Sequence, residues 1–267
     1  MCGIFGFALK NTVNVHEAVN LLEILEREKS EKEKNPLGGY GAGVAFLALN
    51  GEVKVSKAGK TSSSPARKLY ELVENEPTRV LIGHVRFPIP EFMQTSGFKE
   101  TAQPYLARCL SPNLTVVSVH NGKVANYKQL KEKLKHRHFF ESEKVEFIDS
   151  EVIPHLFEEL TLEKPSANKD NALARLFSLL EGGGNTAAIL QLNSSNKLLH
   201  LFHKGKTRGL TVWTNDHGEI IFCSRENVVQ KTLFGTLIAK EGFRKIFGAG
   251  FREDKAWKHS FRIEGFL

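Results

Sequence analysis

The chain has 267 residues, of which 41% are hydrophobic and 25% are charged, and its formal net charge is +7. These values are ordinary for a soluble globular protein with a sizeable core. They argue against a membrane partner, because no stretch approaches the roughly 18 apolar residues that a span requires. No basic and apolar leader opens the chain, so we expect a cytoplasmic location.

Three cysteines, Cys2, Cys109 and Cys223, form an odd number without metal-type spacing, which argues against a disulfide framework. Cys109 and Cys223 lie among apolar residues, and we expect both to be reduced core thiols, as in a cytosolic protein. Part of the positive charge gathers in the segment 123–137. No aromatic residues interleave with its lysines, so the segment is interpreted as a solvated helix face and no nucleic-acid partner is expected.

The first predicted elements are a strand, a helix and a hairpin. Residues 3–9 are apolar and punctuated by glycine, as in a buried strand. Apolar residues at helical spacing predict an amphipathic helix over 16–34, whose charged end we expect to be exposed. Strands are predicted at 43–49 and 52–57, and Asn50–Gly51 between them is a strong hairpin signal.

A further helix is predicted to begin at Ser64–Pro65, with Leu69 and Leu72 facing inward, because proline suits a first helical turn. Residues 88–104 show no clear periodicity, and long irregular segments inside compact domains are often functional. The remaining predictions are strands 79–85 and 114–120, helices 127–135, 150–160 and 171–180, and strands 186–192, 197–202, 210–213 and 220–223. A block of strands, then of helices, then of strands favours an α+β sandwich over alternating βαβ units. Residues from 240 onward match no single pattern.

The chain opens Met1-Cys2-Gly3-Ile4-Phe5-Gly6, so removal of Met1 would leave a thiol and a free α-amine on one residue. The small side chain of Cys2 should permit that removal. An α-amine has a pKa of about 8, so it can serve as a base near neutral pH, and a nearby base raises the thiolate fraction. Taken alone, an early cysteine is more simply a small buried hydrophobe.

Three other fragments stand where predicted strands end or a predicted helix begins. They are Gly83-His84-Val85-Arg86-Phe87, Val119-His120-Asn121-Gly122 and Ile148-Asp149-Ser150-Glu151. Each has a simple structural interpretation of its own: a surface ion pair, a turn and a helix N-cap. Together with the opening residues, and in this order, they resemble the class II glutamine amidotransferases, which are N-terminal-nucleophile (Ntn) hydrolases that release ammonia from glutamine. The resemblance runs from Met1 to about Ser224.

The resemblance implies an α+β fold, a four-layer αββα sandwich of antiparallel sheets of the Ntn-hydrolase type. It implies a single domain over 1–267, with its core at about 2–224 and a C-terminal extension at 225–267. Cys2 would be the nucleophile, its α-amine the base, and a glutamyl thioester the intermediate. No metal or organic cofactor is required for this half-reaction.

The other matched residues suit the parts of glutamine. The guanidinium of Arg86 would pair with the α-carboxylate, and the carboxylate of Asp149 with the α-ammonium. The side-chain amide of Asn121 and the backbone N–H of Gly122 would form the oxyanion hole. His84 and His120 complete the candidate substrate-binding set, although the simpler interpretation of each is an oriented histidine of the core.

Two departures and one weak motif qualify this assignment. Family members often carry Ser or Thr just beyond the arginine, where this chain has Phe87-Pro88-Ile89, so Thr95, Ser96 or main-chain groups would replace that contact. The loop 87–96 is the candidate cover over glutamine. His136-Arg137-His138 has no third ligand in sight, so no metal site is expected there.

The predicted function is hydrolysis of L-glutamine to glutamate and ammonia, with the ammonia passed to a separate synthase. No phosphoribosyl-, sugar- or dinucleotide-binding signature follows the matched region, so we expect a free-standing subunit. The basic segment 123–137 or the C-terminal segment would dock the synthase. Two alternatives stay open: a γ-glutamyl amide or peptide hydrolase that uses the same Cys2, and a non-catalytic, amidotransferase-like binding module.

Overall fold

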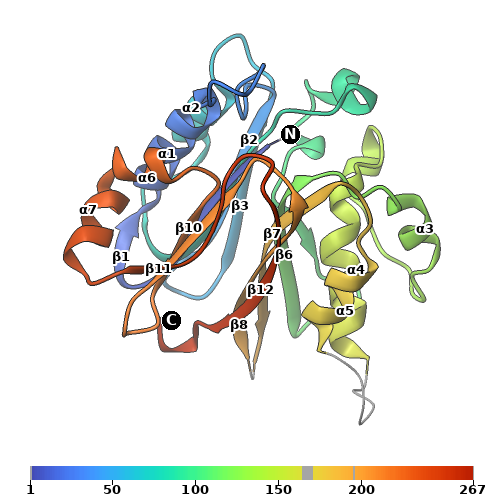
Figure 1. Cartoon of the computed structure of the whole chain (residues 1–267). Helices are drawn as coiled ribbons and strands as arrows, with labels where there is room; N and C mark the ends of the chain where they lie inside the picture. Colours follow the sequence, from blue (N-terminus) through green and yellow to red (C-terminus); the bar gives the residue numbers. More distant parts are fainter. Residues whose placement is uncertain (1, 164–170, 195, 267) are drawn as a thin grey trace.

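Two antiparallel β-sheets lie face to face in the centre of the molecule, and helices cover both outer sides (Figure 1). The computed structural model describes residues 2–163, 171–194 and 196–266. The larger sheet has seven strands in the order β11 (Arg244–Ala249), β9 (Leu210–Thr214), β10 (Ile220–Cys223), β1 (Gly3–Asn14), β4 (Pro77–Val85), β2 (Gly41–Leu47) and β3 (Val53–Gly59). The smaller sheet has five, in the order β12 (Asp254–Arg262), β8 (Lys197–Lys206), β7 (Gly184–Asn193), β6 (Leu114–Gly122) and β5 (Tyr105–Ala107). The four-layer αββα sandwich of the Ntn-hydrolase type is confirmed.

The helices divide between the two outer faces (Figure 1). The larger sheet carries α1 (Val15–Arg27), α2 (Pro65–Leu72), α6 (Glu226–Gln230) and α7 (Leu233–Lys240). The smaller sheet carries α3 (Tyr127–Glu132), α4 (Val152–Leu162) and α5 (Ala172–Leu179). Single 3₁₀ turns are η1 (Pro90–Thr95), η2 (Lys99–Thr101), η3 (Ser142–Lys144), η4 (Asp149–Glu151) and η5 (Glu264–Phe266). Among the described residues, every helix is too short or too polar to traverse a lipid bilayer.

Three apolar layers hold the sandwich together, because side chains of a strand alternate between its two faces. On β4, Val80 and Ile82 point into the layer between the sheets, whereas Leu81 and Val85 point toward the helices of the larger sheet. A third layer lies between the smaller sheet and its helices. Each fully buried Leu, Ile or Phe contributes about 1.5–3 kcal/mol, so these layers are the main source of stability.

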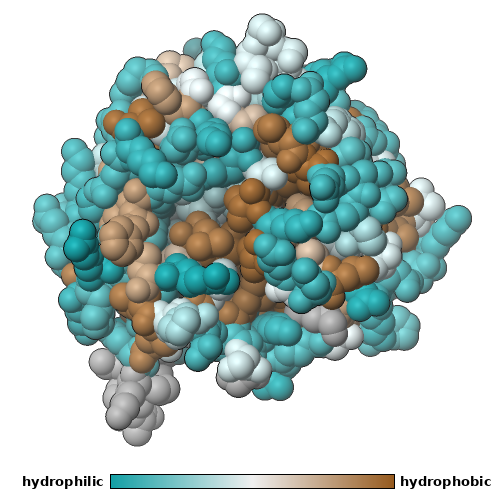
Figure 2. All heavy atoms as spheres, turned by 180° about the vertical axis from the view of Figure 1, so that it is seen from behind, coloured by the Kyte–Doolittle hydropathy of each residue, from teal (hydrophilic) through white to brown (hydrophobic). Residues whose placement is uncertain are grey.

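The chain after Cys223, which the sequence pattern left largely unplaced, extends both sheets. Strand β11 pairs with β9 at one edge of the larger sheet, and β12 pairs with β8 at one edge of the smaller sheet. Seen from the opposite side of the molecule, apolar side chains gather along a hollowed strip in the middle of the face, between hydrophilic margins (Figure 2). The helices therefore leave part of the apolar surface uncovered.

Several local predictions from the sequence were wrong, and each error has a physical cause. The predicted helix over 16–34 ends at Arg27, and two residues of its charged end, Glu26 and Glu33, are buried rather than exposed. Glu26 accepts hydrogen bonds from the Ser64 hydroxyl at 2.7 Å and the Ala66 N–H at 2.9 Å. Glu33 pairs with Arg208 and Arg225, which lie in the segments after β8 and β10. Such long-range partners leave no local signal.

Two further errors concern single elements. Leu72, expected to face inward at the end of α2, is 48% exposed, because the helix ends there and turns away from the core. The short strand β5 was not predicted at all, since its three residues are too few to show a period.

Candidate active site

The four sequence fragments meet at one end of the sandwich, between the two sheets. Strand β1 begins at Gly3, which pairs with Val85 at the end of the antiparallel strand β4. Cys2 and Arg86 therefore lie just beyond neighbouring strand ends. Asn121 ends β6 in the opposite sheet, where its side chain reaches the start of β1. Asp149 lies in η4, immediately before α4.

Cys2 lies with its sulfur against the start of the loop that follows Arg86. Its Sγ accepts a hydrogen bond from the Phe87 N–H at 3.4 Å and lies 3.6 Å from the Phe87 carbonyl oxygen. The residue is 9% exposed, so the thiol is nearly enclosed. Met1, whose removal the amine-base mechanism requires, lies outside the described residues.

Asn121 is held in one orientation by Cys2. The Cys2 backbone nitrogen donates to Asn121 Oδ1 at 3.1 Å, which assigns the other end of the amide as NH₂. That Nδ2 is buried and has no hydrogen-bond partner among the described residues. A buried donor without a partner costs stability, and such a donor beside a nucleophile is suited to a developing oxyanion.

Gly122 must be glycine for a steric reason. Its φ is +153°, and a Cβ there would lie 2.2 Å from the Gly184 carbonyl oxygen on the adjacent strand β7. The close approach keeps the backbone next to Asn121 in a conformation that other residues rarely adopt. The predicted oxyanion-hole pair is therefore placed at the end of a rigid strand.

Arg86 is a buried cation with neutral partners. Its guanidinium is 4% exposed and donates to Thr101 Oγ1 at 2.8 Å and Thr95 Oγ1 at 2.7 Å. No Asp or Glu forms an ion pair with it among the described residues. Burial lowers the pKa of Arg86, but an arginine stays charged at neutral pH. A buried guanidinium without a carboxylate can bind an incoming anion strongly.

Asp149 supplies the opposite charge. Its Oδ2 accepts a hydrogen bond from the Val124 N–H at 2.8 Å. Burial, opposed by that bond and assisted by the charge of Cys2, raises the pKa of Asp149 to about 6. Asp149 and Cys2 also act electrostatically on Arg86, so the three predicted site residues share one local field. Asp149 is mainly ionised at pH 7.

The two candidate histidines lie behind this group of charges. Burial lowers the pKa of His84 to about 3 and that of His120 to about 4, so both are neutral near pH 7. The His120 ring lies 2.8 Å from Ser150 Oγ through Nδ1 and 3.0 Å from Asn185 Oδ1 through Nε2. With both nitrogens engaged, His120 is placed to position η4 against β6 and β7 rather than to reach a ligand.

Two positioning residues were absent from the predicted site. Thr101 binds Arg86, as described above, and Gln103 clamps the backbone of His120. The Gln103 side chain donates to the His120 carbonyl at 3.1 Å and accepts from its N–H at 2.6 Å. Both residues lie in the irregular segment 88–104, and that irregularity was the one available signal. Thr95, expected to contact the substrate, is turned toward Arg86.

The expectation that His138 has no further candidate ligand is wrong. The fold brings it together with Cys109, His155 and Glu158. Cys109 is accordingly half-buried in a polar cluster and is not a core thiol. The available sequence signal was the spacing of His155 and Glu158, which places both on one face of the predicted helix over 150–160.

Known proteins resemble this chain in sequence and in fold. No protein-family model matches the chain. A glutamine–fructose-6-phosphate aminotransferase (isomerizing) of Sulfurisphaera tokodaii is 32% identical over 193 residues, which are 71% of this chain and 28% of that protein. A protein of the same name from Nostoc sp. is 29% identical over 197 residues, 71% of this chain and 27% of the relative. The chain thus spans about a quarter of the length of these relatives.

Among solved structures, one titled as the allosteric regulatory enzyme of purine biosynthesis superposes with a TM-score of 0.62 at 17% identity. It covers 98% of this chain and 49% of the other. The glutamine phosphoribosylpyrophosphate amidotransferase of B. subtilis, complexed with ADP and GMP, gives a TM-score of 0.59 at 17% identity with the same coverage. At this identity, the two likenesses show that the chain has the fold of these amidotransferase structures. The sequence relatives and the shared fold together make the chain a homologue of class II glutamine amidotransferase domains.

Proposed function

We propose that this domain hydrolyses L-glutamine to glutamate and ammonia through Cys2. Removal of Met1 would free the α-amine of Cys2, which takes the thiol proton and delivers it to the leaving ammonia. The thiolate attacks the side-chain amide, a glutamyl thioester forms, and water then releases glutamate. The observation that carries the proposal is the convergence of Cys2 with the unpartnered Asn121 amide and two buried, oppositely charged side chains.

Each end of glutamine has a complementary group in this arrangement. The α-carboxylate would bind Arg86, whose guanidinium is held by hydrogen bonds to two threonine hydroxyls. The α-ammonium would bind Asp149. Fixing both charges aims the amide at Cys2 and makes the attack effectively intramolecular. Asn121 Nδ2 and the Gly122 N–H would bind the oxyanion, and one such donor is worth about 100- to 1,000-fold in turnover.

The segment 87–96 would form the cover over bound glutamine. Its first residue contacts the nucleophile sulfur, and Thr95 at the end of η1 contacts Arg86. A substrate carboxylate that binds Arg86 would therefore also change the contact between Arg86 and this loop. Such coupling would exclude water while the thiolate attacks, so that water reaches the thioester only after ammonia has left.

The released ammonia would be passed to a synthase, which we propose to be a separate subunit. Support for a synthase as the acceptor comes from the relatives, whose names describe transfer of glutamine nitrogen. We propose a single domain over 1–267 in a cytoplasmic protein. Neither a metal nor an organic cofactor takes part in the proposed hydrolysis.

The test is glutamate release from L-glutamine by the purified chain, with the amino terminus checked by intact mass. Cys2→Ala should abolish release, whereas Cys223→Ala, which removes a buried thiol elsewhere, should retain it. Equal rates with and without Cys2 would refute the thiol mechanism. A retained Met1 on native, folded protein would favour the binding-module alternative, and faster release from γ-glutamyl peptides than from glutamine would favour the peptide hydrolase.

A further inference from the structure

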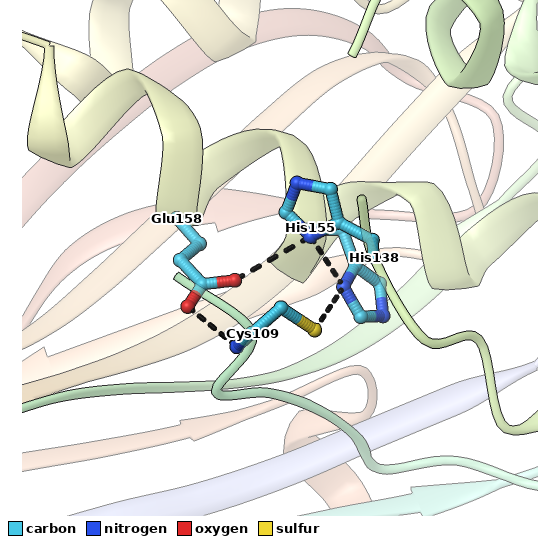
Figure 3. A group of neighbouring side chains, drawn as sticks. All are labelled: Cys109, His138, His155 and Glu158. Carbon is cyan, nitrogen blue, oxygen red and sulfur yellow. Dashed lines mark hydrogen bonds and ion pairs between the residues drawn. The ribbon is translucent and has the colours of Figure 1, made fainter. Parts of the chain in front are cut away.

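Four side chains of metal-binding type meet between the smaller sheet and its helices, in a place that the proposed hydrolysis does not use. Cys109 follows β5, His138 lies in the segment after α3, and His155 and Glu158 lie on α4 (Figure 3). One ligand atom from each, Sγ, two imidazole nitrogens and a carboxylate oxygen, lies within 4.8 Å of every other. We propose that this cluster, the Cys109 site, is a structural zinc site.

The distances within the Cys109 site match the coordination shell of one zinc ion. The two Nδ1 atoms of His138 and His155 lie 3.1 Å apart, Cys109 Sγ lies 3.7 Å from His155 Nδ1, and Glu158 Oε2 lies 3.5 Å from His138 Nδ1. Around a tetrahedral zinc ion with the usual Zn–N, Zn–O and Zn–S bond lengths, two nitrogen or oxygen ligand atoms lie about 3.3 Å apart. A sulfur and a nitrogen ligand atom lie about 3.6 Å apart. These three separations match one tetrahedral shell, and all four ligand atoms lie within 4.8 Å of one another, so small side-chain adjustments would bring them onto one ion.

Hydrogen bonding alone does not account for the cluster. Two facing Nδ1 atoms can share only one proton, so one histidine at most donates to the other. Glu158 Oε2 has no hydrogen bond, its side chain is fully buried, and no lysine or arginine of the described chain pairs with it. A buried carboxylate in that position is costly, and a divalent cation would supply the missing partner.

The groups behind the ligands are those that support metal sites. His138 presents its other ring nitrogen to Glu159 Oε1 at 3.3 Å, whereas His155 Nε2 lies 4.0 Å from Glu151 Oε1, beyond hydrogen-bond distance. A carboxylate behind each imidazole fixes the tautomer and the ring orientation of a metal-bound histidine. His138 thus has the support that a metal-bound histidine requires, and the His155 ring has an acidic side chain behind it at a longer distance.

The other two ligands are anchored through the main chain. Cys109 Sγ accepts a hydrogen bond from the Phe139 N–H at 3.4 Å, a contact that suits a thiolate. Glu158 Oε1 accepts from the Cys109 N–H at 2.8 Å and the Leu110 N–H at 2.9 Å, which leaves Oε2 turned toward the centre. Cys109, His138 and Glu158 are therefore each held by a hydrogen bond to a group outside the four ligand atoms.

The ligand set indicates both the metal and its role. One thiolate, two imidazoles and one carboxylate in a four-coordinate arrangement favour Zn²⁺ over Mg²⁺ or Ca²⁺, which prefer oxygen ligands. Four protein ligands leave no open position, so the ion would be structural. It would tie the loop after β5 and the segment after α3 to α4, the helix that η4 and Asp149 directly precede. The proposal does not depend on glutaminase activity.

The test is the metal content of the full chain, made in zinc-supplemented medium and then dialysed against a weak chelator. The Cys2→Ala background is used throughout, so that the first thiol cannot bind metal adventitiously. We expect about one zinc ion per chain in this parent and loss to background in Cys109→Ser and His155→Gln. Glu159→Gln, which removes the charge behind His138 and leaves all four ligands in place, should weaken zinc binding by about 10- to 100-fold.

A matched control and an optical measurement keep the test independent of variant folding. His217→Gln changes an exposed turn histidine and should keep the parent's zinc content. Co²⁺ added to the metal-free parent should give a thiolate-to-cobalt charge-transfer band and the intense visible bands of four-coordinate cobalt, both displaced by Zn²⁺. Zinc at background in folded parent protein, or unchanged zinc in both Cys109→Ser and His155→Gln, would overturn the proposal.

Discussion

Replacing Asp149 by asparagine should stabilise the protein and inactivate it. Asparagine keeps an oxygen for the Val124 N–H, now 2.8 Å from Asp149 Oδ2, but carries no charge. Burial is the main reason that the pKa of Asp149 rises from 3.8 to about 6. A change of about two pKa units corresponds to about 3 kcal/mol at 25 °C, which is an upper estimate of the free energy that the ionised side chain costs the folded state.

The sign of this effect depends on pH. Because the pKa is higher in the folded protein than in the unfolded chain, the folded state binds more protons between about pH 4 and pH 6. The contribution of Asp149 to the free energy of unfolding is therefore fully present below about pH 4 and is lost as the pH rises through 6. Asp149→Asn should exceed wild type in stability by up to about 3 kcal/mol at pH 7.5, and the difference should shrink to nothing near pH 4.

Activity should change in the opposite direction. Without the carboxylate, the substrate ammonium would be buried without a partner, which costs about 3–5 kcal/mol and lowers kcat/KM by at least about 100-fold. In wild type, kcat/KM should fall as the pH drops below about 6, since protonated Asp149 cannot pair with the ammonium. The variant should lack this acid limb.

Urea unfolding at several pH values and glutamate release over the same range measure both effects. Asp216→Asn is the control of equal charge change, because the Asp216 side chain is 83% exposed and should alter neither quantity. A stability gain that is the same at pH 4 and pH 7.5 would show that burial does not make ionised Asp149 costly. A variant with wild-type kcat/KM would show that Asp149 does not bind the substrate.

Three further predictions test the oxyanion hole, the carboxylate site and the core. Asn121→Ala should lower kcat by about 100- to 1,000-fold with little change in KM, whereas the control Asn113→Ala, at an exposed position, should leave kcat unchanged. A rise in KM alone would assign Asn121 to substrate binding. Arg86→Lys should raise KM for glutamine at least about tenfold, because an ammonium cannot keep both threonines and a bidentate carboxylate; an unchanged KM would contradict the assignment. Gly43→Ala should lower the free energy of unfolding, measured with urea, by more than about 2 kcal/mol, because its Cβ would lie 2.3 Å from the Gln103 carbonyl oxygen. Gly97→Ala is the control, because open space surrounds its Cβ, and equal stabilities of the two variants would refute the clash.

The amino-acid sequence was sufficient for the fold class and for the types of residue in the site. Short apolar runs such as 79–85 and 114–120, the second rich in β-branched residues, indicated the strands, because burial on both faces of a sheet leaves a continuous apolar run. The identities of Cys2, Arg86, Asn121 and Asp149 indicated the chemistry, since a thiol, a guanidinium, an amide and a carboxylate match the parts of glutamine.

The tertiary structure alone decided which of these groups touch, and in what state. The raised pKa of Asp149, the neutral histidines and the free Nδ2 of Asn121 all follow from burial between two sheets, which no local pattern encodes. The Cys109 site shows the same limit more sharply, because its ligands come from three separate segments and converge only when α4 packs on the smaller sheet. A strand or helix is determined largely by its own residues, whereas a site requires contacts between segments far apart in the chain, and packing alone determines those contacts.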